Sequence, residues 1–317
     1  MTERPLITGA GGFAGSHLLD YLLSRGHRVH AWSNPEGRAP RAPDGRVTWR
    51  AVDVLERASL KIALAEVRPS IIFHCAGVAD VHGSFRDPAR ALRVNIVGTQ
   101  YLLDAVSEAG LGCRVLVTGS ALVYRPSSEC IDEDHPLAPA TPYGVSKLGQ
   151  EMAASRSPLS VVLTRPFNHA GPRQDPAYVT SAFARQLAAI ETGAMEPMLR
   201  VGNLDARRDI TDVRDVVRAY EVLAVRGRLH HPYNICCGQA YRVGDLLDVL
   251  LSMTRKRVRV EMDPSRLRPS DNPVVLGSHA RLTQDTGWRP EIPIERTLGD
   301  LLDYWRGMLA VRSSHPA

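Results

Sequence analysis

The chain has 317 residues, of which 44% are hydrophobic and 23% charged, and its net charge is +5. This composition is ordinary for a globular enzyme and provides enough chain for one large α/β unit or two interlocked lobes. No apolar run approaches the roughly 18 residues of a membrane span, and the dispersed basic residues lack the interleaved aromatics of a nucleic-acid surface, so we expect neither a membrane segment nor a nucleic-acid partner.

The cysteines and the N-terminal residues indicate where the protein works. The five cysteines are odd in number and contain no CxxC pair, a pattern that favours reduced thiols over disulfides or a metal site. A strand pattern begins almost at the first residue, which leaves no room for a signal peptide. We therefore expect a cytoplasmic protein without a bound metal.

A glycine-rich turn near the start of the chain is the feature around which the rest is organised. It follows a short apolar strand that ends at Ile7, and it precedes a helix whose leucines recur at helical spacing. In this context closely spaced glycines let the backbone approach a pyrophosphate, which binds the N–H groups at the helix N-terminus. The pattern predicts a dinucleotide site that begins with Gly9, Gly12, Phe13, Ala14 and Gly15.

The residues that follow the second and third expected strands bear on the choice of cofactor. NAD-selective folds usually place an acid at the end of the second strand, on the ribose 2′-hydroxyl. Ser33 stands in that place and Arg38 follows it, so we expect NADP(H) to be preferred and NAD(H) to be usable. A solvated loop arginine is the alternative interpretation of Arg38. After the third strand, Asp53 is expected to accept an adenine amino hydrogen beside Val54.

Strand and helix patterns alternate through the first half of the chain. Such alternation predicts a parallel, doubly wound α/β sheet of the Rossmann type. The expected strands cover residues 28–32, 47–52, 70–74, 115–118 and 161–164, and the expected helices cover 56–67, 87–109 and 142–155. Where the cofactor would lie, the sequence supplies Cys75, Ala76, Gly77, Asn95 and Pro166.

Beyond residue 165 prolines break the periodicity. We interpret residues 1–165 as a dinucleotide-binding domain that also receives part of 201–240. Residues 166–310 are expected to form a smaller, interleaved α/β lobe that binds the substrate, and residues 311–317 a frayed tail. The helices expected in this half are 177–192, 212–225, 245–253 and 298–308.

Three side chains are candidates for proton transfer. Tyr143 and Lys147 are four residues apart early in an expected helix, so they share a face. A nearby ammonium stabilises a phenolate and brings its pKa from about 10 towards neutrality, which suits a phenol that exchanges a proton with a carbonyl oxygen during hydride transfer. Lys147 is also expected to hold the nicotinamide ribose. Ser120 follows a strand at the edge where α/β sheets bind ligands, and it is expected to orient the same oxygen; a surface helix and a simple turn serine are the alternatives.

Together with the glycine turn, these residues resemble those of the extended short-chain dehydrogenases/reductases that act on nucleotide sugars. The resemblance spans about residues 4–308. It is closest to the GDP-mannose branch, within which GDP-4-keto-6-deoxy-D-mannose reductases form GDP-D-rhamnose. The segments that resemble this branch are 165–172, 201–215, 266–271 and 277–282.

The resemblance implies roles for further residues in the second half. It places Asn168 on the phosphate and sugar of the substrate, and Arg208 and Arg268 on its diphosphate. Guanidinium groups bind phosphates bidentately, which fits these roles, and a surface ion pair is the alternative for each arginine. Val179 and the residues up to Phe183 would line the nucleotide-base pocket.

The resemblance implies an NAD(P)H-dependent enzyme that reduces the C4 keto group of GDP-4-keto-6-deoxy-D-mannose. The related dehydratases need an acid–base pair after the catalytic hydroxyl, whereas here Ala121 and Leu122 follow Ser120, and neither moves a proton. The alternatives are a nucleotide-sugar 4-epimerase with tightly held NAD, a dehydratase-like enzyme and, outside enzymology, an NADP-sensing regulator. The face of the ketone that receives hydride stays open.

Two helices are candidates for self-association. The apolar stripes of residues 87–109 and 142–155 are expected to pair across a two-fold axis in a homodimer. In the alternative interpretation both stripes face only their own sheet.

Overall fold

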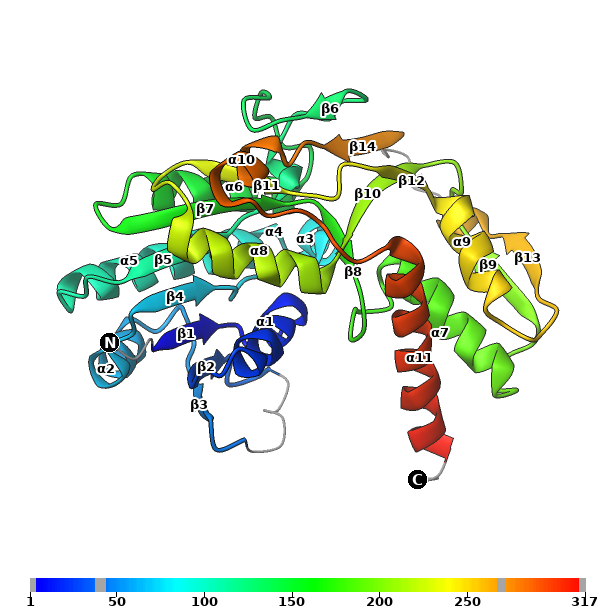
Figure 1. Ribbon diagram of the computed structural model, residues 1–317, viewed down its shortest axis with the longest axis horizontal. Helices are drawn as coiled ribbons and strands as arrows, with labels where there is room; N and C mark the ends of the chain where they lie inside the picture. The colour runs from blue at the N-terminus through cyan, green and yellow to red at the C-terminus, as the bar shows by residue number, and fades with distance from the viewer. Residues whose placement is uncertain (1–3, 38–43, 267–271, 314–317) are drawn as a thin grey trace.

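The computed structural model describes residues 4–37, 44–266 and 272–313, and its centre is a seven-stranded parallel sheet of order β11-β7-β5-β4-β1-β2-β3 (Figure 1). The sheet and its flanking helices confirm the predicted α/β class. The inner strand β1 is buried throughout, as expected for a parallel strand covered on both faces. The strands are β1 (Pro5–Thr8), β2 (Val29–Ser33), β3 (Val47–Ala51), β4 (Ile71–His74), β5 (Arg114–Thr118), β7 (Ser160–Pro166) and β11 (Pro232–Ile235).

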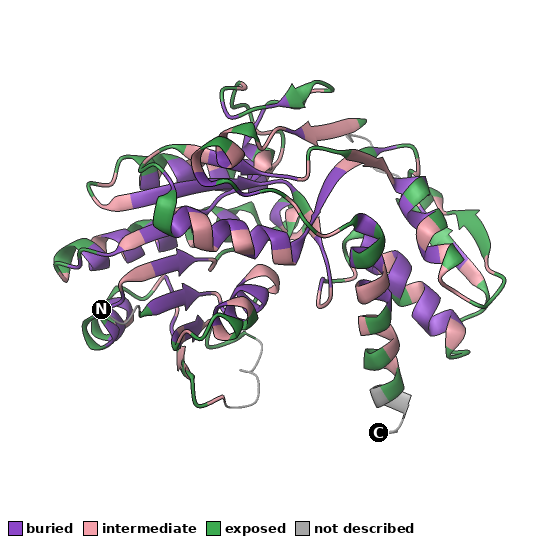
Figure 2. Cartoon of the chain, viewed as in Figure 1, coloured by how far each residue is buried: buried purple, intermediate pink, exposed green. Residues whose placement is uncertain are grey.

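Helices pack against both faces of the sheet, and each face has its own cluster of buried apolar residues. Figure 2 shows these buried residues along the sheet and on the inner sides of the helices. The face that includes Leu18 and Tyr220 is covered by α1 (Phe13–Ser24), α8 (Val213–Arg226) and α10 (Ala280–Thr286). The face that includes Leu60 and Leu102 is covered by α2 (Arg57–Val67), α5 (Gly98–Glu108) and α6 (Pro142–Ser155).

The single helix predicted over residues 87–109 is interrupted. After the short helix α3 (Val81–Arg86), helix α4 (Pro88–Leu92) passes into one turn of π-helix, η1 (Arg93–Val97), before α5 begins. Asn95 lies in this turn and is fully buried. Isolated π turns are frequent at functional sites. This one places the amide side chain of Asn95 beside the carboxyl edge of the central sheet.

The second half of the chain contains short strands that the sequence analysis did not predict, because strands of two to six residues show too little alternation to be recognised. Five of them form one sheet, in which β8 pairs with β10. The other two, β9 and β13, form a separate two-stranded sheet, and β13 is exposed (Figure 2). These strands are β6 (Cys130–Ile131), β8 (Asn168–Ala170), β9 (Met198–Val201), β10 (Arg207–Asp212), β12 (Ala240–Arg242), β13 (Arg259–Met262) and β14 (Val274–Gly277).

Three helices pack with these strands around a third apolar cluster, which includes Phe183, Leu246 and Leu298. They are α7 (Val179–Glu191), α9 (Val243–Ser252) and α11 (Ile294–Ser313). Two short 3₁₀ turns, η2 (Ala121–Val123) and η3 (Pro264–Arg266), complete the elements. Among the helices of the described residues, none has the length and apolarity needed to cross a membrane.

A buried ion pair fastens α6 to the sheet. Arg165 in β7 and Glu151 in α6 are 4% and 8% exposed, and Arg165 Nε lies 2.9 Å from Glu151 Oε2. Arg165 Nη1 also donates to the hydroxyl of Tyr124 at 2.8 Å. Removing one member of such a pair leaves an uncompensated charge in the interior.

We therefore expect Glu151→Ala to lower the free energy of unfolding by about 3–5 kcal/mol, measured from urea midpoints. Asp303→Ala is the matched control, because it removes the carboxylate of the exposed Arg306–Asp303 pair and should change stability by no more than about 0.5 kcal/mol. Equal, small effects of both substitutions would contradict a stabilising role for the buried pair.

Candidate active site

The glycine turn lies between the carboxyl end of β1 and the N-terminus of α1. Gly9 has a φ of +68°, and a Cβ built on it would lie 2.6 Å from the backbone nitrogen of Ala76. A Cβ on Gly15 would collide with the carbonyl oxygen of Gly9. Gly12 is the N-cap of α1 and has no side chain to satisfy the first N–H groups of the helix, which makes this end suitable for an anion.

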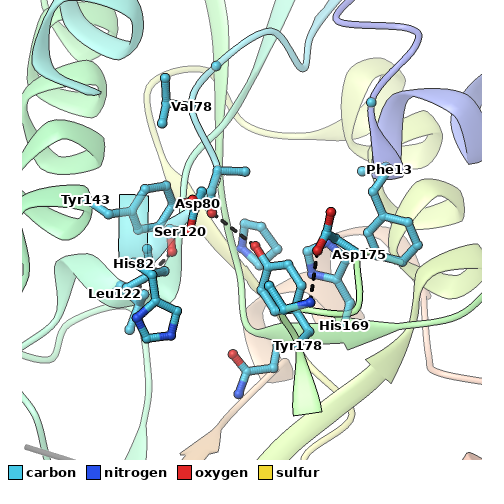
Figure 3. A pocket seen from close by; sticks show the side chains of 18 of the residues that line it. Phe13, Val78, Asp80, His82, Ser120, Leu122, Tyr143, His169, Asp175 and Tyr178 are labelled. Atoms are coloured by element: carbon cyan, nitrogen blue, oxygen red, sulfur yellow. Dashed lines mark hydrogen bonds between the residues drawn. The ribbon is translucent and has the colours of Figure 1, made fainter. Parts of the chain in front are cut away.

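One large cavity, of about 1710 Å³, extends from this turn to the smaller lobe. Figure 3 shows Phe13 of the glycine turn on one side of the pocket and Tyr143 with Ser120 on the other. The cavity therefore brings together most of the side chains that the sequence predicted. Those that line it are Gly9, Gly12, Phe13, Ala14, Gly15, Ser33, Asp53, Val54, Cys75, Ala76, Gly77, Ser120, Tyr143, Lys147, Pro166, Asn168, Val179 and Arg208.

The carboxyl ends of β2 and β3 form one end of this cavity. Ser33 is the last residue of β2 and presents a hydroxyl where NAD-selective folds have a carboxylate. Asp53 follows β3, and its Oδ1 accepts the N–H of Leu55 at 2.9 Å. Glu36, which the sequence analysis did not single out, also lines this end, whereas Arg38 lies outside the described residues.

Ser120 and Tyr143 are brought together by two local caps. Ser120 is the N-cap of η2, where its Oγ accepts the N–H of Leu122 at 3.1 Å. Thr141 caps α6 by accepting the N–H of Gly144 at 3.0 Å, which places Tyr143 in the first turn of the helix. Ser120 and Tyr143 are 7% and 8% exposed, and both line the cavity.

Burial controls the ionisation of the predicted pair. Desolvation raises the pKa of Tyr143 above its usual value, and a hydrogen bond with Ser120 acts in the opposite direction. Burial lowers the pKa of Lys147 to about 8, against a smaller upward effect of Cys75. The expected phenol pKa near neutrality is thus not what the structure has: Lys147 Nζ lies 5.9 Å from the centre of the Tyr143 ring, and desolvation dominates. Burial therefore keeps the phenol protonated.

Asn95 supports the cavity wall from behind. Its Nδ2 donates to the carbonyl of Val78 at 3.1 Å and to the hydroxyl of Ser146 at 2.8 Å, and its Oδ1 accepts the N–H of Val78 at 2.8 Å. A Cβ on Gly77 would lie 2.7 Å from this Oδ1. Asn95 was expected to bind the cofactor, but it is fully buried, and the hydrogen bonds of its side chain go to the loop after β4 and to α6.

The smaller lobe supplies the residues expected to hold the substrate. Asn168 begins β8 and pairs with Ile210 of β10. Arg208 in β10 donates from Nη1 to the carbonyls of Arg207 and Asn272, at 2.9 and 2.8 Å, which fixes its guanidinium at the cavity wall. Val179 is the first residue of α7 and is 39% exposed. Arg268 lies outside the described residues.

Several cavity residues were missed because they lie on loops or on elements too short to give a periodic signal. The hydroxyl of Tyr178, just before α7, donates to the carbonyl of Ala79 after β4 at 3.1 Å, so it spans the two lobes. The ring of His169 in β8 stacks on Phe13, with centroids 5.6 Å apart. Figure 3 shows the missed residues around one pocket: Asp80, His82, His169, Asp175 and Tyr178.

A parallel sheet, a glycine turn at a helix N-terminus and a buried Tyr–Lys pair beside a serine hydroxyl define a class of protein, the NAD(P)-dependent dehydrogenases and reductases. The family model described as GDP-mannose 4,6 dehydratase matches residues 6–301. The chain belongs to this family of extended short-chain dehydrogenases/reductases, as the resemblance implied.

Relatives of this chain include reductases, dehydratases and epimerases of nucleotide sugars. A GDP-6-deoxy-D-mannose reductase from Pseudomonas aeruginosa is 36% identical over 312 residues, with 96% of this chain and 98% of the relative covered. The structure of RMD from Pseudomonas aeruginosa complexed with NADPH has a TM-score of 0.86 at 34% identity and covers 97% of this chain and 100% of its own. A Thermus thermophilus UDP-glucose 4-epimerase complexed with NAD has a TM-score of 0.84 at 28% identity, covering 96% and 99%.

We expect Gly9→Ala to weaken NADPH binding by about tenfold or more. The added Cβ would collide with the backbone of Ala76, and the left-handed conformation of residue 9 costs about 1–2 kcal/mol for a non-glycine residue. The measurement is NADPH fluorescence titration together with urea unfolding. Gly110→Ala is the control: Gly110 has a φ of +59° with nothing within 4 Å of the added Cβ, so it should lose stability but keep cofactor affinity. Unchanged affinity in Gly9→Ala would argue against this turn as the cofactor site.

Proposed function

We propose that this protein is an NAD(P)H-dependent reductase that converts the C4 keto group of GDP-4-keto-6-deoxy-D-mannose to the alcohol of GDP-D-rhamnose. The observation that carries the proposal is that Ser120, Tyr143 and Lys147 are all buried and line the same cavity, and that the residues after Ser120 are Ala121 and Leu122. Dehydration would need an acid and a base at that place, and neither side chain can move a proton. The 36% identical GDP-6-deoxy-D-mannose reductase supports the choice of substrate.

The cofactor is held by the glycine turn and the carboxyl edge of the sheet. The pyrophosphate binds the N-terminus of α1, and the adenosine lies towards Ser33 and Asp53, which line the far end of the cavity. NADPH is preferred because Ser33 adds no negative charge next to a 2′-phosphate, and a relative of similar structure is complexed with NADPH. Glu36 at the same end works against a 2′-phosphate, so NADH is also used.

Reduction needs a hydride and a proton on the same carbonyl group, and NADPH, when bound, supplies the hydride. Tyr143 donates its phenolic proton to the C4 oxygen, and its raised pKa keeps that proton in place until the oxygen gains charge. Ser120 donates a hydrogen bond to the same oxygen and orients it. The phenolate left on Tyr143 is then stabilised by the ammonium of Lys147.

The substrate diphosphate and base bind in the smaller lobe. Arg208, anchored by two backbone carbonyls, grips the diphosphate, and Asn168 contacts the phosphate and sugar. Val179 and Phe183 line the base pocket. Arg268 is assigned to the diphosphate by family resemblance alone. We also place the reaction in the cytoplasm, where the five free thiols would stay reduced.

The test is to mix the protein with GDP-4-keto-6-deoxy-D-mannose and NADPH and to follow the loss of absorbance at the nicotinamide band. We expect NADPH oxidation to depend on the sugar nucleotide, with product NMR identifying the D-rhamnose configuration at C4. With verified substrate, no oxidation of NADPH or NADH would reject the reductase. Turnover of a nucleotide sugar without added cofactor would favour a 4-epimerase instead.

Replacing the proton donor is expected to separate binding from chemistry. Tyr143→Phe removes the hydroxyl but keeps the ring, so kcat should fall by about 10²–10⁴ while NADPH affinity changes little. Tyr304→Phe, on α11 and absent from the cavity lining, is the control and should keep full turnover. A Tyr143→Phe enzyme with unchanged kcat would exclude this phenol as the acid.

We further propose a homodimer built on α4 and α6. These helices expose three apolar side chains on their outer side: Leu92, Val145 and Met152 are 36%, 46% and 51% exposed. Leu92 and Val145 also line a shallow groove together with Pro139 and Pro142. A second copy would cover this surface through the isologous contact that is common in two-fold dimers.

Val145→Glu is expected to convert the dimer into a 34.8 kDa monomer, because it puts a charge on that apolar surface. Light scattering at low concentration measures the change. Ile62→Glu, on α2 at another exposed apolar position, should leave the dimer intact. If the wild-type protein scatters light only as a monomer, the proposal of a homodimer is rejected.

A further inference from the structure

A chain of buried polar side chains runs from Lys147 into the core behind the cavity. Lys147 Nζ donates to the carbonyl of Thr118 and to Oε1 of Gln150, both at 2.9 Å. Nε2 of Gln150 in turn donates to the hydroxyl of Thr99 in α5 at 2.8 Å. Gln150 and Thr99 are both fully buried, so water does not compete for these bonds.

The hydroxyl of Thr99 sets the direction of the hydrogen bonds that it makes with Gln150 and His74. It donates its one proton to the carbonyl of Asn95 at 2.7 Å, so it can only accept from Gln150 and from His74 Nε2, which lies 2.8 Å away. His74 therefore carries its proton on Nε2, and its Nδ1 accepts from the hydroxyl of Thr8 at 2.8 Å. Thr8 is the last residue of β1, next to Gly9.

These directions leave the Gln150 amide with a single orientation. If the amide were turned over, its oxygen would face the Thr99 hydroxyl, whose proton already serves Asn95, and its NH₂ would face the ammonium of Lys147. Both contacts would then be unfavourable. The bonds of Thr99 thus present Oε1 of Gln150, and not its nitrogen, to Lys147.

The ammonium of Lys147 depends on these neutral acceptors. An ammonium has three donors, and two of them are directed at Thr118 and Gln150 inside the wall. Lys147 lines the cavity, so the third is available to a ligand there. The titratable groups near it are Tyr143 on the same helix, and Cys75 and His74 at the end of β4. Burial, with a smaller effect of the Lys147 charge, lowers the pKa of His74 to about 3, so this ring stays neutral at working pH.

We propose that Gln150 is a positioning residue which, oriented by Thr99 and His74, keeps the Lys147 ammonium charged and directed into the cavity. A hydrogen bond to the charged form of a group favours that form, so the acceptor offsets part of the desolvation that burial imposes on Lys147. Through Thr99, His74 and Thr8 the same bonds connect the proton-transfer helix to the glycine turn. The consequence for turnover rests on the proposed reductase function, whereas the consequence for the charge of Lys147 does not.

The composition of the chain allows this charge to be measured directly. There are only three lysines in the sequence, Lys61, Lys147 and Lys256, so protein grown on lysine labelled with ¹³C at Cε gives three signals, assigned with Lys61→Arg and Lys256→Arg. We expect Gln150→Met, which has similar volume but no acceptor oxygen, to lower the pKa of Lys147 by about one unit. Gln150→Glu, which places a carboxylate at the same contact, should raise it.

Further variants separate positioning from a general structural role. Thr99→Val removes the hydroxyl that orients Gln150 and should lower the pKa of Lys147, whereas Thr99→Ser keeps the hydroxyl and should restore it. Gln100→Met is the matched control, because Gln100 is an exposed glutamine on α5 that bonds Asp104. It should leave the pKa of Lys147 unchanged. If Gln150→Met does not fold, the Gln150→Glu and Thr99 variants decide.

In the reductase assay, the fall of kcat at high pH should move in the same direction as the pKa of Lys147 in each variant, and Gln150→Met should lower kcat/KM by about tenfold to a hundredfold. Titrations of Lys147 that stay the same in Gln150→Met and Gln150→Glu would overturn the proposal. A wild-type protein that does not reduce the keto sugar would reject the proposed function, but the NMR titration would still test the role of Gln150.

Discussion

The close approach of two backbones at the carboxyl edge of the sheet is the constraint on which the site depends. A Cβ on Gly9, after β1, would lie within 2.7 Å of the backbone of Ala76, after β4. Because no side chain can stand between them, the floor of the cavity is bare backbone on which a flat ring can lie. The same approach sets Thr8 within a hydrogen bond of His74, and the buried polar chain behind the site starts there.

In the site above that floor, burial controls the protonation of Tyr143 and Lys147 more than paired charges do. Tyr143 and Lys147 are removed from water, so the phenol holds its proton more tightly and the ammonium less tightly than they would at the surface. The ammonium is compensated by the carbonyl of Thr118 and the amide oxygen of Gln150. Neutral acceptors leave it able to stabilise a phenolate on Tyr143, which a buried carboxylate partner would oppose.

The two lobes are not successive along the chain. Strand β10 of the smaller lobe leads directly into α8, which packs on the central sheet, and β11 then joins that sheet beside β7. Arg208 lies on β10, so its position is tied to the central sheet, from which β5 leads to Ser120 and on which α6, with Tyr143, packs. The stacking of His169 on Phe13 and the bond from Tyr178 to Ala79 make further contacts across the cavity.

Much of the fold and the centre of the site could be predicted because they depend on local spacing. The glycines after β1, the buried parallel strands and the Tyr–Lys pair on one turn of α6 are each encoded within a few residues, and the sheet edge then brings them together. Spacing predicted that Tyr143 and Lys147 share a helix face. It did not predict that burial raises the pKa of the phenol, because desolvation depends on what packs around it.

The sequence by itself determined the parallel α/β class, the glycine turn and the Ser120, Tyr143 and Lys147 set, since periodicity and short motifs express them directly. Only the tertiary structure decided that Asn95 turns into the wall, that β11 joins the central sheet and that Tyr178 reaches Ala79. It also decided that Gln150 faces Lys147 through Thr99 and His74. These contacts join segments tens of residues apart, and no local pattern records which polar groups will be left to satisfy one another once the apolar faces have packed.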